Sequence, residues 1–152
     1  MLNFTIQGKV KAKQSVKIGR NGIKYTPADV VEYANYVKLC FKQAYPNWDI
    51  QEFEETPLRV LIKVFYPIPK SFSKKKHIEA SLGFLRPITK PDCDNIAKSI
   101  CDALNGIAYR DDRQIATLAV RKEYTSKVER VEVTIETEQI TEEEKRILGL
   151  AG

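Results

Sequence analysis

The stretch KPDCDNIAKSICDALNGIAYRDDRQI, residues 90–115, holds five aspartates. Its spacing predicts a helix from Asp94 to Leu104, because at 100° per residue Asp94, Lys98 and Asp102 fall within about 80° of one another. Gly106 would end this helix in the left-handed conformation. The apolar residues share a different face: Ile96, Ile100, Ala103, Leu104 and Ile107. We therefore expect an amphipathic helix that packs on a sheet and holds a polar stripe in a fixed orientation.

More carboxylates flank this helix. Asp92 follows Pro91 at an extended position, and Asp111 and Asp112 return after the Asn105-Gly106 turn, at the entry to the next strand. Asp92, Asp94 and one member of the later pair can therefore meet at one point. Three converging carboxylates repel one another unless a cation lies between them. Oxygen-only ligands favour Mg²⁺ or Mn²⁺ over zinc, and Lys98 would then stabilise negative charge on a phosphate.

Structural roles explain the same residues without a metal ion. Asp94 is a good helix N-cap, and Asp111 and Asp112 suit a turn. Asp94 and Lys98 have the spacing of an ordinary helical ion pair. The Asp-x-Asp pair also occurs in metal-dependent glycosyltransferases, although this chain is short for one and its basic loops would then have no evident role.

The composition bounds the kind of protein. The chain has 152 residues, of which 43% are hydrophobic and 30% are charged, as expected for one compact domain with a core. It has no long apolar run and no signal-peptide pattern at its start, so we expect a cytoplasmic protein without a membrane segment. Three cysteines without CxxC spacing and the lone His77 argue against a disulfide framework, a zinc site and a histidine triad.

The charge is +5 overall and is unevenly distributed. No acidic residue precedes Asp29, and a second basic run, from Lys70 to Lys90, lies just before the aspartate-rich segment. A single basic run is often only a solvated surface. Two such runs beside an acidic pocket indicate a polyanionic partner.

The remaining sequence predicts an α+β domain. We expect strands over 2–8 and from Leu58 to Pro67, and a helix from Thr26-Pro27 to the residue before Pro46. Residues 71–89 read as a long mobile loop with at most one helical turn around His77 to Leu82. We then expect a β-hairpin formed by 115–124 and 128–137, and a short terminal helix capped by Thr141 with Glu144 in the capping box. This order indicates a single domain with a mixed or antiparallel sheet and helices packed on one side.

The run PDCDNIAKSICDALNGIAYRDDRQI resembles the signature of the RusA family of Holliday-junction resolvases. That signature has two aspartates around one residue, then Asn, a helix that carries Lys, a DAL(N) segment, and a DD pair before an apolar strand. The resemblance extends over residues 1–138, which implies a RusA-like endonuclease domain there. Residues 139–152 lie outside it as a short acidic C-terminal helix and tail.

This resemblance implies a homodimeric, Mg²⁺-dependent endodeoxyribonuclease, often prophage-encoded, for which Mn²⁺ can substitute. Such enzymes resolve four-way DNA junctions in recombination and repair by paired, symmetric cleavage, without an organic cofactor. By position, Asp92 and Asp94 match the two motif carboxylates, Lys98 the essential lysine and Asp112 the catalytic member of the DD pair. Asp111 and Asp102 match frequent acidic positions, and Asp111 is a further candidate metal ligand.

The same interpretation accounts for the basic runs, because a DNA nuclease needs cations at the phosphates around its acidic pocket. The candidate DNA-binding residues are Lys9, Lys11, Lys13, Arg20 and Lys24, then Lys74, Lys75 and Lys76, and Lys122. Phe72 is a candidate for contact with unstacked bases. The alternative is a non-catalytic branched-DNA-binding recombination accessory protein, in which the aspartates only cap and hydrogen-bond.

Overall fold

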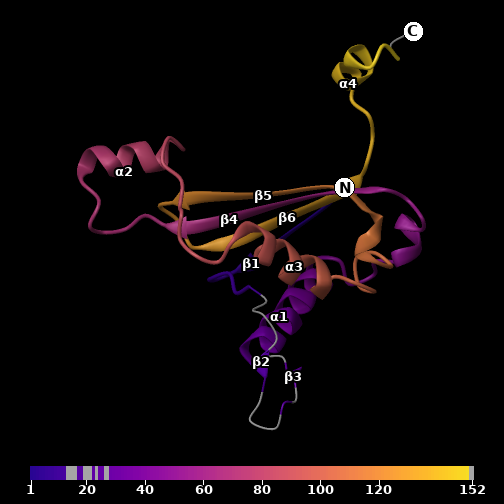
Figure 1. The fold of residues 1–152 in the computed structure, drawn as a ribbon, viewed down its shortest axis with the longest axis horizontal. Coiled ribbons are helices and arrows are strands. Elements are labelled where there is room, and N and C mark those ends of the chain that lie inside the picture. The colour runs from indigo at the N-terminus through magenta and orange to yellow at the C-terminus, as the bar shows by residue number, and fades with distance from the viewer. Residues whose placement is uncertain (13–16, 19–21, 23, 26–27, 151–152) are drawn as a thin grey trace.

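The chain alternates strands with helices and forms one four-stranded sheet and one two-stranded sheet. A computed structural model describes residues 1–12, 17–18, 22, 24–25 and 28–150 (Figure 1). Its elements, in order, are β1 (Leu2–Gln7), β2 (Lys17–Ile18), β3 (Lys24–Tyr25), α1 (Ala28–Ala44), the 3₁₀ helix η1 (Ile50–Phe53), β4 (Leu58–Pro67), α2 (Lys74–Ser81), α3 (Cys93–Ala103), the 3₁₀ helix η2 (Asp112–Gln114), β5 (Ile115–Thr125), β6 (Arg130–Thr137) and α4 (Glu142–Ile147).

The main sheet has four strands in the order β1-β6-β4-β5. β6 pairs antiparallel with both β1 and β4, whereas β5 pairs parallel with β4. The register places Phe4, Val133 and Ile62 in one row across the sheet, and all three are buried. The sheet is therefore mixed, as the α+β prediction allowed.

The core lies on one face of this sheet, where α1 and α3 pack (Figure 1). Alternate residues of β4 are buried along most of its length, which is the pattern of a strand with one covered face. The ring of Phe41 from α1 meets Phe4 edge-to-face at 5.3 Å. These contacts show α1 and α3 packed together against one face of the sheet, as predicted.

The predicted β-hairpin is wrong. β5 and β6 do form where the sequence indicated, but β4 lies between them and pairs with both. β4 is the strand with the longest alternating buried pattern, so a central position covers it best and satisfies its backbone groups on both edges. The connection from β5 to β6 passes the end of β4, where Pro67 pairs with Thr125.

Two further predictions need correction or fall outside the described residues. The segment 71–89 contains a helix of eight residues, α2, whose N-cap Ser73 accepts a hydrogen bond from the amide of Lys76. Because this local cap satisfies an otherwise unpaired donor, the basic run forms a helix rather than a loop. The predicted cap at Thr26-Pro27 lies in the part of the chain that the structure does not describe.

The terminal helix agrees with its prediction. Thr141 caps α4, and Thr141 and Glu144 form both hydrogen bonds of a capping box. α4 buries no residue and stands clear of the sheet (Figure 1). Among the helices of the described residues, none is long and apolar enough to cross a membrane.

Candidate active site

The helix α3 begins one residue earlier than the spacing indicated. Asp92, not Asp94, is its N-cap, and the Asp92 side chain makes no capping hydrogen bond. Asp94 therefore lies in the first turn, where the partial positive charge of the helix N-terminus favours a carboxylate. The capping role that would explain Asp94 without chemistry does not apply, and the carboxylate of Asp92 is not used by the helix end.

The polar stripe of α3 is present as predicted. Asp94, Lys98 and Asp102 are exposed, while Ile96 and Ile100 on the other face are fully buried. Within the described helices, ion pairs join Lys75 to Glu79 and Lys145 to Glu142, but Asp94 and Lys98 form none. Asp94 and Lys98 are therefore not joined by the ordinary ion pair that their spacing permits.

A tight return after α3 carries the chain towards the aspartate pair. Gly106 adopts a φ of 72°, as expected for a left-handed cap, and its amide donates to the carbonyl oxygen of Tyr109 at 2.8 Å. The buried Tyr109 hydroxyl donates to the carbonyl oxygen of Cys101 at 2.7 Å, and the indole of Trp48 donates to Ala108 at 2.9 Å. These bonds fix where Asp111 and Asp112 emerge relative to α3.

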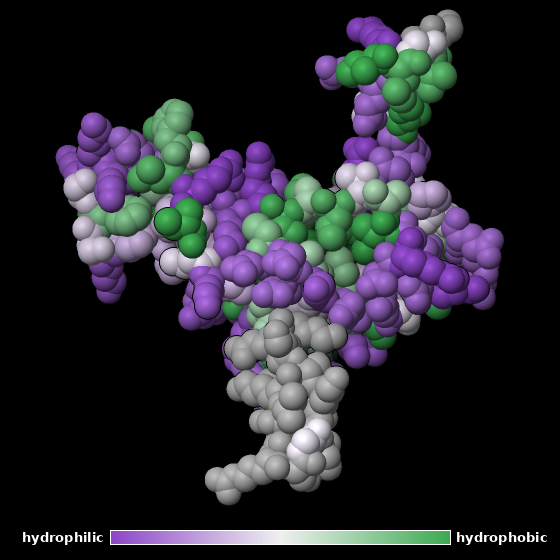
Figure 2. Space-filling view, in the orientation of Figure 1, coloured by the Kyte–Doolittle hydropathy of each residue, from purple (hydrophilic) through white to green (hydrophobic). Residues whose placement is uncertain are grey.

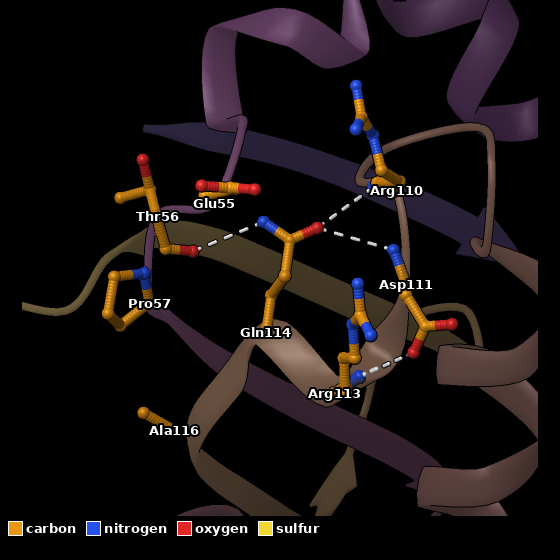
Figure 3. Close-up of a pocket in the computed structure, with 8 residues that line it drawn as sticks. All are labelled: Glu55, Thr56, Pro57, Arg110, Asp111, Arg113, Gln114 and Ala116. Carbon is orange, nitrogen blue, oxygen red and sulfur yellow. Dashed lines mark hydrogen bonds between the residues drawn. The ribbon is translucent and has the colours of Figure 1, made fainter.

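Gln114 holds the aspartate pair in place. Its amide nitrogen donates to the carbonyl oxygens of Phe53 and Thr56 at 2.6 and 3.2 Å, and its carbonyl oxygen accepts from the amides of Arg110 and Asp111 at 3.0 and 3.2 Å. Figure 3 shows this side chain between Thr56 and Asp111, at a pocket of about 500 Å³. The two segments that Gln114 joins, 53–56 and 110–111, are far apart in sequence, so this one side chain sets their relative position.

Asp111 caps η2, since its carboxylate accepts from the amide of Arg113 at 2.9 Å. Asp112, the next residue, is not the cap of η2. Burial raises the pKa of Asp112 above its usual range, and the neighbouring carboxylates of Asp102 and Asp111 raise it further. The structure thus brings Asp112 against Asp102, the residue at the far end of the stripe on α3.

The predicted set of Asp92, Asp94 and Asp112 spans a longer distance than the contact between Asp112 and Asp102. Ten residues separate Asp92 from Asp102, which is about 15 Å along a helix. In the part of the chain that the structure describes, no group of three or more histidine, cysteine, aspartate or glutamate side chains is placed to hold a metal ion. The donors nevertheless suit a hard divalent cation, because carboxylate oxygens crowd around Asp112 and a cation would relieve their repulsion.

The basic N-terminal loop lies beside α3. The hydroxyl of the buried Ser99 donates to the backbone carbonyl oxygen of Lys11 at 3.0 Å. Lys9 and Lys11 line a hollow of about 260 Å³ together with residues of α1. Lys13 and Arg20 lie outside the described residues, and of Lys24 only the backbone, in β3, is described.

The second basic group lies on α2. Lys74, Lys75 and Lys76 are exposed there, and Figure 1 shows α2 extending beyond the end of the sheet. Lys122, on β5, donates to the carbonyl oxygen of Thr89 at 2.7 Å and so ties the segment before α3 to the sheet.

Phe72, the candidate for contact with bases, packs its ring edge-to-face on Tyr124 at 5.6 Å, with the ammonium of Lys76 at 5.1 Å from the ring centre. Its ring is therefore already partly covered. The aromatic residue of this segment that is most open to solvent is Phe84, which is 77% exposed.

Sequence reasoning missed Ser99 and Gln114. Gln114 had a readable signal, because Asp111-Asp112-Arg113-Gln114 has the spacing of a capping box, and both bonds of that box are present. Ser99 had no such signal, because no sequence pattern indicates which distant group a serine on the buried side of a helix will bond.

The chain is similar in sequence to a known family and to a protein of another organism. The family described as endodeoxyribonuclease RusA matches residues 5–136. The uncharacterised protein YqaN of Bacillus subtilis (strain 168) is 39% identical in an alignment 140 residues long, which covers 88% of this chain and 94% of that protein. RusA proteins are hydrolases that act on Holliday junctions, and nucleases of this family generally depend on a divalent metal ion. With its stripe on α3 and its aspartate pair before β5 inside the matched region, the chain belongs to the RusA endodeoxyribonuclease family.

Proposed function

We propose that this chain resolves four-way DNA junctions by paired, symmetric phosphodiester cleavage that depends on Mg²⁺, in recombination or repair. The observation that carries the proposal is the position of Asp112. Its carboxyl group lies against Asp102 of α3 and has a raised pKa, inside the region that matches the nuclease family. Repelling carboxylates of this kind are costly to stability and are useful where a cation and a phosphate bind.

Asp112 is a proposed metal ligand, with Asp111 as a further candidate. Asp92 and Asp94 are the other proposed ligands, and because they lie at the opposite end of α3 from Asp112 they would hold a separate ion. Asp92 supports this role because its side chain is not used by the helix cap. When bound, Mg²⁺ would supply an activated water and neutralise charge on the phosphodiester. The carboxylates of this chain would hold that ion and orient the water towards phosphorus.

Lys98 is the proposed stabiliser of the reacting phosphate. Its exposed side chain lies one turn from Asp94 and is not neutralised by it. As water adds to phosphorus and one strand oxygen leaves, negative charge grows on the remaining oxygens. An ammonium group already positioned there stabilises this charge more than it stabilises the substrate.

The basic residues would bind the arms of the junction. Lys11 lies on the loop that Ser99 joins to α3, with Lys9 in the same loop, and Lys74, Lys75 and Lys76 lie on α2, which contacts β5. Such phosphate contacts orient the duplex without reading its sequence. Lys13, Arg20, Lys24 and Lys122 remain proposed members of this surface.

The test is cleavage of a labelled mobile four-way junction and a matched linear duplex, with Mg²⁺ or with EDTA. We expect paired nicks from the wild type on the junction only, and only with metal. Asp94→Asn should reduce the rate at least about 100-fold. The matched control is Asp29→Asn, which removes an exposed carboxylate from α1, in its first turn, and should cut normally.

A second arm separates the enzyme from a non-catalytic binding protein. Tight junction binding by the wild type, without cutting under any condition and without change in Asp94→Asn, would make the chain an accessory factor. Equal cutting of junction and duplex would instead refute the structure selectivity.

A further inference from the structure

One arginine beside the aspartate pair has no carboxylate partner. The arginines of the main sheet and its connections otherwise pair with glutamates: Arg59 with Glu138, Arg86 and Arg121 with Glu123, Arg110 with Glu54, and Arg130 with Glu132. Arg113 directly follows Asp112, and Asp111 accepts a hydrogen bond from its backbone amide. Its guanidinium forms no ion pair or hydrogen bond with the residues that the structure describes. This cation is therefore available to a ligand.

The 3₁₀ helix η2 directs three successive side chains in three directions. Consecutive residues of a 3₁₀ helix are about 120° apart around its axis, since it has 3.0 residues per turn. Asp112 lies against Asp102 of α3, and Gln114 bonds to carbonyl oxygens of the segment 53–56. Arg113 takes the third direction, and Figure 3 shows its side chain rising beside Gln114 at the pocket of about 500 Å³.

This pocket has rigid and mostly polar walls. One wall is the segment before β4 and the other is the turn before β5, and the four hydrogen bonds of Gln114 tie the two together. Glu55 in the first wall has a φ of 49°, which is uncommon for a residue other than glycine and persists only where the surrounding structure holds it. Figure 2 shows hydrophilic surface over η1 and over the turn that carries η2. The pocket thus suits a polar ligand.

The charges that line the pocket are balanced. Arg113 and Arg110 lie opposite the carboxylates of Glu55 and Asp111, and Arg110 is already paired with Glu54. Without a net positive charge, the pocket has no field that would gather free anions. A guanidinium can still form two parallel hydrogen bonds with a phosphate that other contacts bring to it. These features favour a phosphate that belongs to a larger molecule, such as a DNA strand.

The position of Arg113 fits the strand that would be cut. Its Cα atom is about 3.8 Å from that of Asp112, because the two residues are adjacent. Successive nucleotides of one DNA strand advance about 3.4 Å along the helix axis. When one phosphate lies at Asp112, the next phosphates of the same strand therefore lie within reach of a long side chain that points away from Asp112.

We propose that Arg113 binds a DNA phosphate within two nucleotides of the cut, in the strand that is cut. This contact fixes the strand so that the reacting phosphate lies at the aspartates. The inference rests on the proposed function and deepens it, because it assigns a residue to the positioning of the cut strand. The lysines of α2 and of the N-terminal loop, in contrast, are proposed to hold the arms of the junction.

Single-turnover cleavage of the four-way junction by Arg113→Gln tests this role. We expect the bound complex to cut about 10- to 100-fold more slowly, because the strand loses a charged contact that aligns it. The Tm should not change, since the guanidinium has no partner in the described chain. Arg113→Lys keeps the charge but not the fork, so it should recover part of the rate.

Arg146→Gln is the matched control. Arg146 is exposed on α4 and, like Arg113, forms no ion pair with the described residues, so its replacement removes the same charge at a site far along the chain from the aspartates. This variant should cut at the rate of the wild type. Equal slowing of both variants would mean that only the net charge of the protein matters, and would overturn the contact.

A neutral phosphate in the substrate identifies the partner of Arg113. Once the cut is mapped, single methylphosphonates are placed at each phosphate within two nucleotides of it, because a methylphosphonate keeps the linkage and removes its negative charge. At one position the wild type should slow about as much as Arg113→Gln slows on the unmodified junction. Arg113→Gln should slow no further there, since the two changes remove the same interaction. If Arg113→Gln does not fold, Arg113→Lys takes its place in this cycle.

Two results would overturn the contact while the proposed function stands: cleavage by Arg113→Gln at the rate of the wild type, or methylphosphonate and Arg113 effects that multiply at every position. A wild type that cuts no junction with metal present would refute the proposed function, and this inference with it. Cleavage by the wild type on the unmodified junction therefore distinguishes the two failures.

Discussion

Ser99 Oγ lies 3.0 Å from the backbone carbonyl oxygen of Lys11 and donates a hydrogen bond to it. This bond joins the basic N-terminal loop to the helix that carries Asp94 and Lys98. Because Ser99 is only 5% exposed, water cannot easily replace it as the donor. The proposed DNA-binding loop and the proposed catalytic helix are therefore joined through one buried hydroxyl.

Ser99→Ala should release this coupling. We expect the protein to be about 1 kcal/mol less stable, with a several-fold weaker affinity for the junction and little change in the rate of the bound complex. Single-turnover cleavage at varied protein concentration separates these two effects. Thr134→Val is the control, since it removes a hydroxyl that bonds Asn3 on the sheet, remote from α3. A slower bound complex with unchanged affinity would contradict the coupling.

Asp112→Asn should abolish cleavage and stabilise the protein without metal. The raised pKa of Asp112 means that the folded state binds this proton more tightly than the unfolded chain. Its contribution to the free energy of unfolding therefore falls as the pH rises from the ordinary carboxyl range through the raised pKa. Thermal unfolding from about pH 4 to pH 7 should show a smaller decline in Asp112→Asn than in the wild type.

The same pair of proteins tests metal binding without any assay of activity. A ligand that binds the folded state alone raises its stability, so Mg²⁺ should raise the Tm of the wild type. The increase should be much smaller in Asp112→Asn. An equal rise in both proteins would mean that Asp112 is not a ligand.

Gln114→Ala should loosen the turn that positions Asp112. The change removes four hydrogen bonds to Phe53, Thr56, Arg110 and Asp111, at a pocket that water can enter, so we expect stability to fall by about 1–2 kcal/mol. Cleavage of bound junction should fall more than junction affinity. Gln114→Glu keeps the two acceptor contacts, so it should retain more activity than Gln114→Ala if positioning is the role of this residue.

Replacement of Lys74, Lys75 and Lys76 by alanine should weaken binding and reduce its salt dependence. For every phosphate that a lysine no longer neutralises, the slope of log K against log salt should become shallower by about 0.9 on duplex DNA. Gel-shift titrations at several salt concentrations measure this slope. Lys42→Ala, at an exposed position in the last turn of α1, is the control. A triple variant with an unchanged slope would remove α2 from the DNA surface.

A chain ending at Glu138 should fold and cut like the full chain. α4 buries no residue, and the last strong tie before it is the ion pair of Arg59 with Glu138 at 2.7 Å. Thermal unfolding and junction cleavage of the shortened chain test this. A large fall in Tm would show that the endonuclease domain extends beyond residue 138.

Local patterns in the sequence determined a good part of this protein. The exposed stripe of Asp94, Lys98 and Asp102, the left-handed Gly106 and the capping box of Thr141 all appear where their spacing indicated. Each depends on residues within one or two turns of one another, so backbone geometry alone relates them. The RusA family was also recognisable from one short run of residues, and the family match over residues 5–136 confirms it.

Tertiary structure decided what local spacing cannot. β4 lies between β5 and β6, because the most apolar strand gains most from two neighbours, and no turn signal encodes that choice. Asp112 has Asp102 and Asp111 as its neighbouring carboxylates, and Gln114 reaches residues about sixty positions earlier. Such contacts follow from how the sheet and helices pack, since packing brings together side chains whose separation in sequence carries no period.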